Sequence, residues 1–152
     1  MVDRICGRLH LMEVRYHPLF ERWLMELAEA DEEIFGEVMA LLTALETHGR
    51  DLDDERREES HPVVTSRYDM HALRRTPPTD VTPYAERPPV LRILYAVCRA
   101  PIGERAVVLL GGDKPDLGNA WYPANVAEAE ARLDQYARHH TDTTPIVKRG
   151  NR

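Results

Sequence analysis

The sequence predicts one α+β domain, in which an antiparallel sheet of about four strands is covered by an N-terminal helical hairpin and a C-terminal helix. Apolar residues alternate or run continuously in four segments, and they recur at helical spacing in three others. At 152 residues the chain is long enough to bury one core. We therefore assign residues 1–140 to a single domain and residues 141–152, which offer no apolar face, to a flexible tail.

The first predicted elements are a strand over 9–16 and two helices. Near alternation of apolar residues in LHLMEVRY predicts the strand. A helix over 17–30 follows, with Pro18 in its first turn and apolar residues at helical spacing. A second helix over 31–49 begins on acidic residues and ends at Gly49. Because the connection between the helices is very short, we expect an antiparallel hairpin.

A strand between two polar connections comes next. The charged run over 50–62 has no periodicity, so we predict a solvated loop. Weak alternation in RYDMHALRR predicts a strand over 67–75. Residues 77–89 hold five of the eleven prolines, which a central strand does not tolerate. We predict an exposed connection there.

Two strands and a helix complete the predicted domain. Residues 90–98 and 105–112 are rich in Val, Ile and Leu, and the turn APIGE joins them. Pro123 begins a helix over 123–140 that has apolar residues along one face. The predicted order is therefore strand, two helices, three strands, helix.

Charge is unevenly distributed along the chain. The net charge of −6 disfavours a nucleic-acid partner if only the sum is considered. Residues 1–60, however, carry 7 Lys/Arg against 16 Asp/Glu, whereas residues 61–152 carry 13 against 10. A basic working face and an acidic helical side can therefore coexist on one small domain.

Several functional classes lack their sequence signals. No apolar run reaches the length of a membrane-spanning helix and no signal peptide is recognisable, so we expect a cytoplasmic protein without a membrane partner. Cys6 and Cys98 are too few and too far apart for a metal site or a disulfide framework. His139 and His140 are interpreted as a helix-end feature. With no phosphate loop or serine-triad motif either, we expect no metal and no cofactor.

Four short motifs follow one another on these elements: MHALRR, LRILYAV, a Gly-Asp-Lys turn, and a Trp-Tyr pair before the last helix. With FERWL in the helical hairpin, they resemble the RelE/HigB superfamily, and most closely its HigB-like, phage-derived branch, over residues 12–138. The resemblance implies a RelE-like fold and the toxin of a type II toxin-antitoxin system. Such a toxin enters the ribosome, cuts messenger RNA without a metal and is held inactive by a cognate antitoxin, typically a helix-turn-helix protein. Residues 1–11 would then be an extension.

Cationic side chains are the first candidates for this chemistry. Cleavage of RNA through its own 2′-hydroxyl requires stabilisation of charge on phosphorus. Arg92 lies in an apolar strand, where a charge is costly unless it faces solvent or a ligand, and a guanidinium binds phosphate through two hydrogen bonds. Arg74 can share its face if the two strands pair. The resemblance implies that Arg92 and Arg74 lie in the active site, and we assign Arg75 to RNA binding. The alternative is that these are surface arginines.

The last loop supplies three further candidates. Lys114 follows two glycines that allow close approach to a ligand, and the resemblance implies a phosphate contact; the alternative is a simple turn with a solvated lysine. Tyr122 is similar in position to a tyrosine that some RelE relatives use in catalysis. A phenol can act as an acid or hydrogen-bond donor without a pKa shift, whereas to act as a base it needs neighbouring cations such as Arg92 and Lys114 to lower its pKa. Trp121 is assigned to RNA binding by base stacking, with anchoring of the loop to the core as the alternative.

His71 is a candidate for proton transfer, because imidazole titrates near neutral pH. It lies three residues before Arg74, however, and residues three apart on a strand point to opposite faces. A surface or sheet-packing histidine is therefore the competing interpretation.

A second function remains open from the sequence. The same fold could serve as a catalytically silent module that binds a protein partner through its acidic helical hairpin. The excess of carboxylates over residues 1–60 favours this interpretation.

Overall fold

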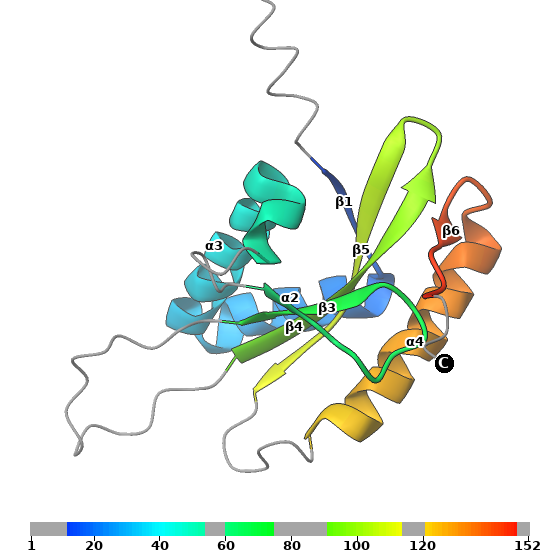
Figure 1. Cartoon of the computed structure of the whole chain (residues 1–152). Coiled ribbons are helices and arrows are strands. Elements are labelled where there is room, and N and C mark those ends of the chain that lie inside the picture. The colour runs from blue at the N-terminus through cyan, green and yellow to red at the C-terminus, as the bar shows by residue number, and fades with distance from the viewer. Residues whose placement is uncertain (1–11, 54–59, 75–90, 114–120, 149–152) are drawn as a thin grey trace, which may run out of the picture.

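The computed structural model describes residues 12–53, 60–74, 91–113 and 121–148 (Figure 1). The elements in chain order are β1 (Glu13–Tyr16), α2 (Pro18–Ala30), α3 (Glu32–His48), the 3₁₀ helix η1 (Gly49–Asp53), β2 (Ser60–Pro62), β3 (Met70–Arg74), β4 (Leu91–Ala100), β5 (Gly103–Asp113), α4 (Trp121–His139) and β6 (Thr144–Pro145). The predicted α+β class, the helical hairpin and the C-terminal helix are confirmed.

The described strands form one mostly antiparallel sheet in the order β1-β5-β4-β3-β2, with β6 pairing with β4. The described sheet has six strands rather than about four, because two short strands were not predicted. β1 runs parallel to β5, whereas the other neighbouring strands are antiparallel. The expectation of an antiparallel sheet is therefore correct for the β2–β6 strands and wrong for β1.

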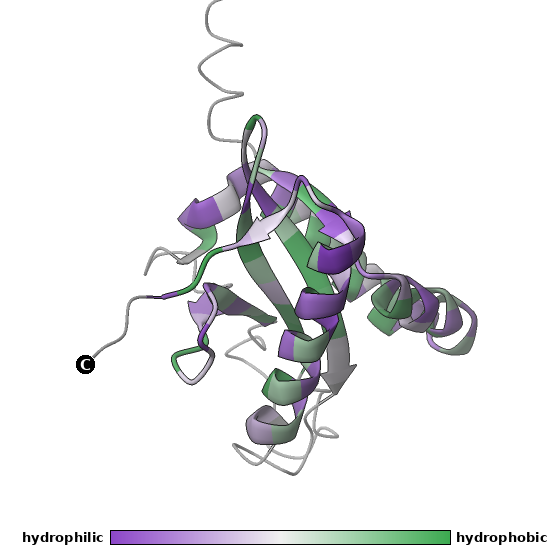
Figure 2. Cartoon of the chain, turned by 90° about the vertical axis from the view of Figure 1, so that its right-hand side faces the viewer, coloured by the Kyte–Doolittle hydropathy of each residue, from purple (hydrophilic) through white to green (hydrophobic). Residues whose placement is uncertain are grey.

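Helices cover both faces of the sheet (Figure 1). Successive side chains of β4 point alternately to the two faces of the sheet. Ile93 packs with Phe20 and Leu45 of the hairpin α2–α3, whereas Leu94 packs with Leu133 of α4. Figure 2 shows hydrophobic strands lying behind α4, whose turns carry both hydrophilic and hydrophobic residues. The face covered by α4 is also the face to which alternation assigns Arg92.

The hairpin helices begin at side-chain caps. His17 Nδ1 accepts a hydrogen bond from the Leu19 amide at 3.0 Å, and Pro18 occupies the first turn of α2. Asp31 Oδ1 accepts from the Ile34 amide at 3.1 Å at the start of α3. Each cap satisfies an amide that has no partner within its own helix. The single residue between the helices makes the predicted antiparallel hairpin.

Two predicted loop regions contain structure instead. In the run over 50–62, Leu52 of η1 is fully buried and β2 pairs with β3. The segment 141–152, predicted to be a flexible tail, contributes β6, which pairs with Cys98 and Arg99 of β4. Strands of two or three residues show no measurable alternation, so the sequence pattern does not reveal them.

Gly111 of β5 allows close packing of α2 on the sheet. A Cβ at this position would lie 2.6 Å from Cζ3 of Trp23, closer than real Cβ atoms come. The sequence predicts that the glycines at the end of β5 allow the close approach of a ligand. At Gly111 the approaching group is instead the indole of Trp23.

Gly111→Ala is expected to destabilise the fold by about 1–3 kcal/mol, because the new methyl group overpacks the indole. Urea unfolding monitored by circular dichroism measures the change. Gly36→Ala is the matched control, since a Cβ there meets nothing within 4 Å inside α3 and should stabilise the helix by about 0.5–1 kcal/mol. Equal effects of the two substitutions would contradict this explanation.

Candidate functional site

Arg74 and Arg92 lie directly opposite each other on β3 and β4. Directly opposed residues of an antiparallel pair project from the same face, with Cβ atoms roughly 5 Å apart. The prediction that the two arginines share a face is confirmed. Arg92 is also opposite Gly112 of β5. Arg74, Arg92 and Gly112 therefore form one row across three strands, and the glycine leaves the space beside Arg92 free of a side chain of its own.

Arg92 is held in place by two hydrogen bonds. Its Nε donates to the Tyr122 hydroxyl at 3.1 Å, and its Nη1 donates to the Leu91 carbonyl at 2.9 Å. The residue is only 8 % exposed. Within the described parts of the chain, no salt bridge involves Arg92, so its positive charge is not neutralised by a carboxylate there.

Tyr122 comes from a different layer of the protein. It lies in the first turn of α4, is half-buried and packs against the core between α4 and the sheet. Packing against the core therefore fixes the position of the Tyr122 ring, and its hydroxyl contacts Arg92 on β4. A third predicted site residue, Tyr122, thus contacts Arg92, although 30 residues separate the two in sequence.

His71 is not part of this group. Its ring stacks on Tyr95 with centroids 5.2 Å apart, and its Nε2 is 2.8 Å from Asp69 Oδ1. Tyr95 belongs to the core under the helical hairpin, on the opposite face from Arg92. The structure thus places His71 apart from Arg74 and Arg92, as its competing interpretation as a sheet-packing histidine expects, and alternation along β3 is the reason.

His71 contributes to a hydrogen-bond network around Asp69. Burial raises the pKa of the Asp69 carboxyl, but hydrogen bonds from Arg50 and His71 outweigh this and lower its pKa below the usual range. Arg50 in turn contacts both Asp69 and Glu104. This network of hydrogen bonds stabilises the fold beside η1. Its described contacts do not include Arg74 or Arg92.

The side chains of three predicted site residues lie outside the part of the chain that the structure describes. Lys114 and Arg75 lie outside the described residues. Trp121 begins α4, but its side chain is also outside the described part. Their assignments stay predictions.

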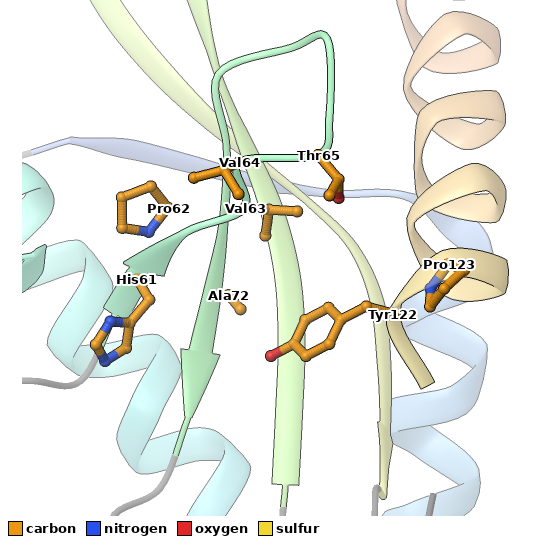
Figure 3. Close-up of a pocket in the computed structure, with 8 residues that line it drawn as sticks. All are labelled: His61, Pro62, Val63, Val64, Thr65, Ala72, Tyr122 and Pro123. Carbon is orange, nitrogen blue, oxygen red and sulfur yellow. The ribbon is translucent and has the colours of Figure 1, made fainter. Parts of the chain in front are cut away.

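A pocket of about 500 Å³ is lined in part by Tyr122, the residue that accepts the hydrogen bond from Arg92 (Figure 3). Its walls come from β2, the loop after it, β3 and the start of α4. The lining residues are His61, Pro62, Val63, Val64, Thr65, Ala72, Tyr122 and Pro123. Sequence reasoning missed this pocket because it predicted a solvated loop where β2 forms one wall.

No family model, curated protein or solved structure matches the chain. Among the described residues, no cluster of three or more His, Cys, Asp or Glu side chains could hold a metal ion. In that same part of the chain, no helix is both long and apolar enough to cross a membrane.

Proposed function

We propose that the chain is a metal-independent endoribonuclease that cleaves messenger RNA on the ribosome, the toxin of a type II toxin-antitoxin system. The observation that carries the proposal is the Arg74–Arg92 pair with Tyr122 bonded to Arg92. Further support comes from the element order, in which a strand and a helical hairpin precede the consecutive paired strands β3, β4 and β5 and a helix, with the short strands β2 and β6 as additions. This is the order expected from the resemblance to the RelE/HigB superfamily.

Paired guanidinium groups suit an RNA phosphate. Each can donate two hydrogen bonds to phosphate oxygens and stays charged at any relevant pH. The hydrogen bonds of Arg92 to described residues use Nε and Nη1, which leaves Nη2 for a phosphate in this part of the chain. Its low exposure removes water that would screen the interaction, so the attraction to a phosphate is stronger than at an open surface.

The cleavage step follows from the chemistry of RNA. The ribose 2′-oxygen bonds to phosphorus as the bond from phosphorus to the 5′-oxygen breaks, which leaves a 2′,3′-cyclic phosphate and a 5′-hydroxyl. The 2′-hydroxyl proton passes to solvent. Tyr122 donates a proton to the departing 5′-oxygen and regains one from solvent. Arg74 and Arg92 stabilise the additional charge on phosphorus in the transition state.

The proposed partners follow from this activity. The substrate is messenger RNA in the ribosome of the cytoplasm. A cognate antitoxin, of the helix-turn-helix kind, would hold the toxin inactive. No metal or small-molecule cofactor takes part in the proposed reaction.

Expression of the chain without an antitoxin tests the proposal. Induced cells should stop growing, and their messages should acquire new 5′-hydroxyl ends, which primer extension maps. Normal growth with intact messages, at an expression level verified by immunoblot of the soluble protein, would overturn it.

A specific observation favours the catalytically silent binding module as a second candidate. Met25 of α2 is 70 % exposed, and a groove of about 400 Å³ beside it includes Glu21, Glu26 and Glu29. An exposed apolar side chain among carboxylates is suited to a basic, amphipathic protein segment. This candidate predicts that the chain is never toxic and that Met25→Glu abolishes binding of its partner.

A further inference from the structure

The pocket lined in part by Tyr122 has walls suited to a flat, apolar ring. Most of its lining is aliphatic, contributed by Val63, Val64 and Pro62. Two rings, His61 and Tyr122, lie on either side of Ala72 in Figure 3. Its volume of about 500 Å³ falls in the range of small-molecule pockets.

The register of the sheet places one lining residue of the pocket, Ala72, a single row away from the arginines on the same face. His61 is opposite Ala72, and Ala72 is opposite Leu94, so these residues form one row across the face under α4. Arg74 and Arg92 form the next row on that face. Two residues along a strand correspond to about 7 Å, which a ribose can span.

Tyr122 belongs to both parts of this surface. Its ring lines the pocket, and its hydroxyl accepts the hydrogen bond from Arg92 Nε. A ligand that fills the pocket therefore touches the same side chain that positions the guanidinium. Aromatic rings bind nucleobases by stacking, and guanidinium groups bind phosphates.

We propose that this pocket is a nucleobase subsite, which holds the base of the nucleotide whose phosphate contacts Arg74 and Arg92. The inference rests on the proposed RNA-cleaving function and extends it to a recognition element. The pocket depends on β2 and the loop after it, so these residues would determine which base follows or precedes the cleaved bond. Base selection at this position is then a property of the short edge strand, not of the arginines.

Two probes separate the base from the phosphate: the four ribonucleoside 5′-monophosphates and inorganic phosphate. We expect at least one nucleotide to bind at least tenfold more tightly than inorganic phosphate in isothermal titration calorimetry of the full chain. Ala72→Leu fills the pocket floor with an uncharged side chain. It should reduce nucleotide affinity at least tenfold and leave phosphate affinity unchanged, with thermal unfolding as the check on the fold.

A second pair of variants changes exposed residues instead of the buried Ala72. Val64 is 81 % exposed at the pocket, and Ile102 is 87 % exposed in the turn between β4 and β5. Val64→Ser should lower nucleotide affinity about three- to tenfold, because it removes an apolar wall, whereas Ile102→Ser should change neither affinity.

The outcomes distinguish the pocket from the arginine site. The base subsite is overturned if nucleotides bind no more tightly than inorganic phosphate. It is also overturned if Ala72→Leu and Val64→Ser leave the ratio of nucleotide affinity to phosphate affinity unchanged. In both cases the arginine site stands. If neither probe loses affinity in Arg92→Gln, the proposed function fails as well. Binding of a protein partner at the pocket, with no nucleotide affinity, would also overturn the inference.

Discussion

Arg92→Gln is expected to reduce the rate of RNA cleavage by about 10²- to 10³-fold, the usual cost of removing one group that stabilises developing charge. Glutamine keeps a polar side chain that can contact the Tyr122 hydroxyl but carries no charge for the phosphate. The measurement is single-turnover cleavage of a message bound to purified ribosomes. Growth arrest on expression should disappear in parallel.

Controls for Arg92 are available on the same strand. Arg99 lies near the other end of β4 and is exposed, so Arg99→Gln removes the same charge without touching the arginine pair. We expect its cleavage rate to stay within about threefold of the original protein, an allowance for long-range electrostatics. Arg92→Lys should give an intermediate rate, because lysine keeps the charge but lacks the planar fork. Equal activity of Arg92→Gln and Arg99→Gln would rule out the proposed role of Arg92.

Phe20→Ala is expected to destabilise the protein by about 3–5 kcal/mol, the usual cost of deleting a buried aromatic side chain. Phe20 is completely buried in α2. Its ring lies 5.9 Å from that of Tyr16 and 5.5 Å from that of Trp23, measured between centroids. The side chain therefore joins the first strand, the helical hairpin and the sheet. Such a loss is a large part of the 5–15 kcal/mol typical of a domain.

Leu19→Ala is the matched control for this prediction. Leu19 is adjacent in the same helix but 38 % exposed, so its loss should cost less than about 1.5 kcal/mol. Urea unfolding followed by circular dichroism gives both values. Phe20→Ala should also lower cleavage only in proportion to the folded fraction, in contrast to Arg92→Gln. Similar costs for the two substitutions would show that Phe20 does not join the layers as described.

The two strands that carry Arg74 and Arg92 could be predicted from local patterns, alternation in one and a run of Val, Ile and Leu in the other. Their shared face was a conditional prediction, because it also requires that β3 and β4 pair in the observed register. Alternation already spoke against His71, which the structure places on the opposite face beside Tyr95. Where a candidate conflicted with alternation, alternation was correct.

The pocket and the edge strands could not be predicted in this way. β2 spans three residues and β6 spans two, so neither shows a period. They are stabilised by backbone pairing with strands that are distant in sequence, and this does not depend on their side chains. The parallel pairing of β1 with β5 is equally invisible, because an apolar strand carries no mark of the direction of its neighbour.

That parallel pairing has a consequence for synthesis of the protein. Glu13 of β1 pairs with Arg105 of β5, and their side chains also form a hydrogen bond across 92 residues of chain. Closing a loop of this length costs chain entropy before the pairing is gained. During synthesis, β1 has no partner strand until β5 has been made and has left the ribosome. The described sheet therefore cannot be completed before that point of translation.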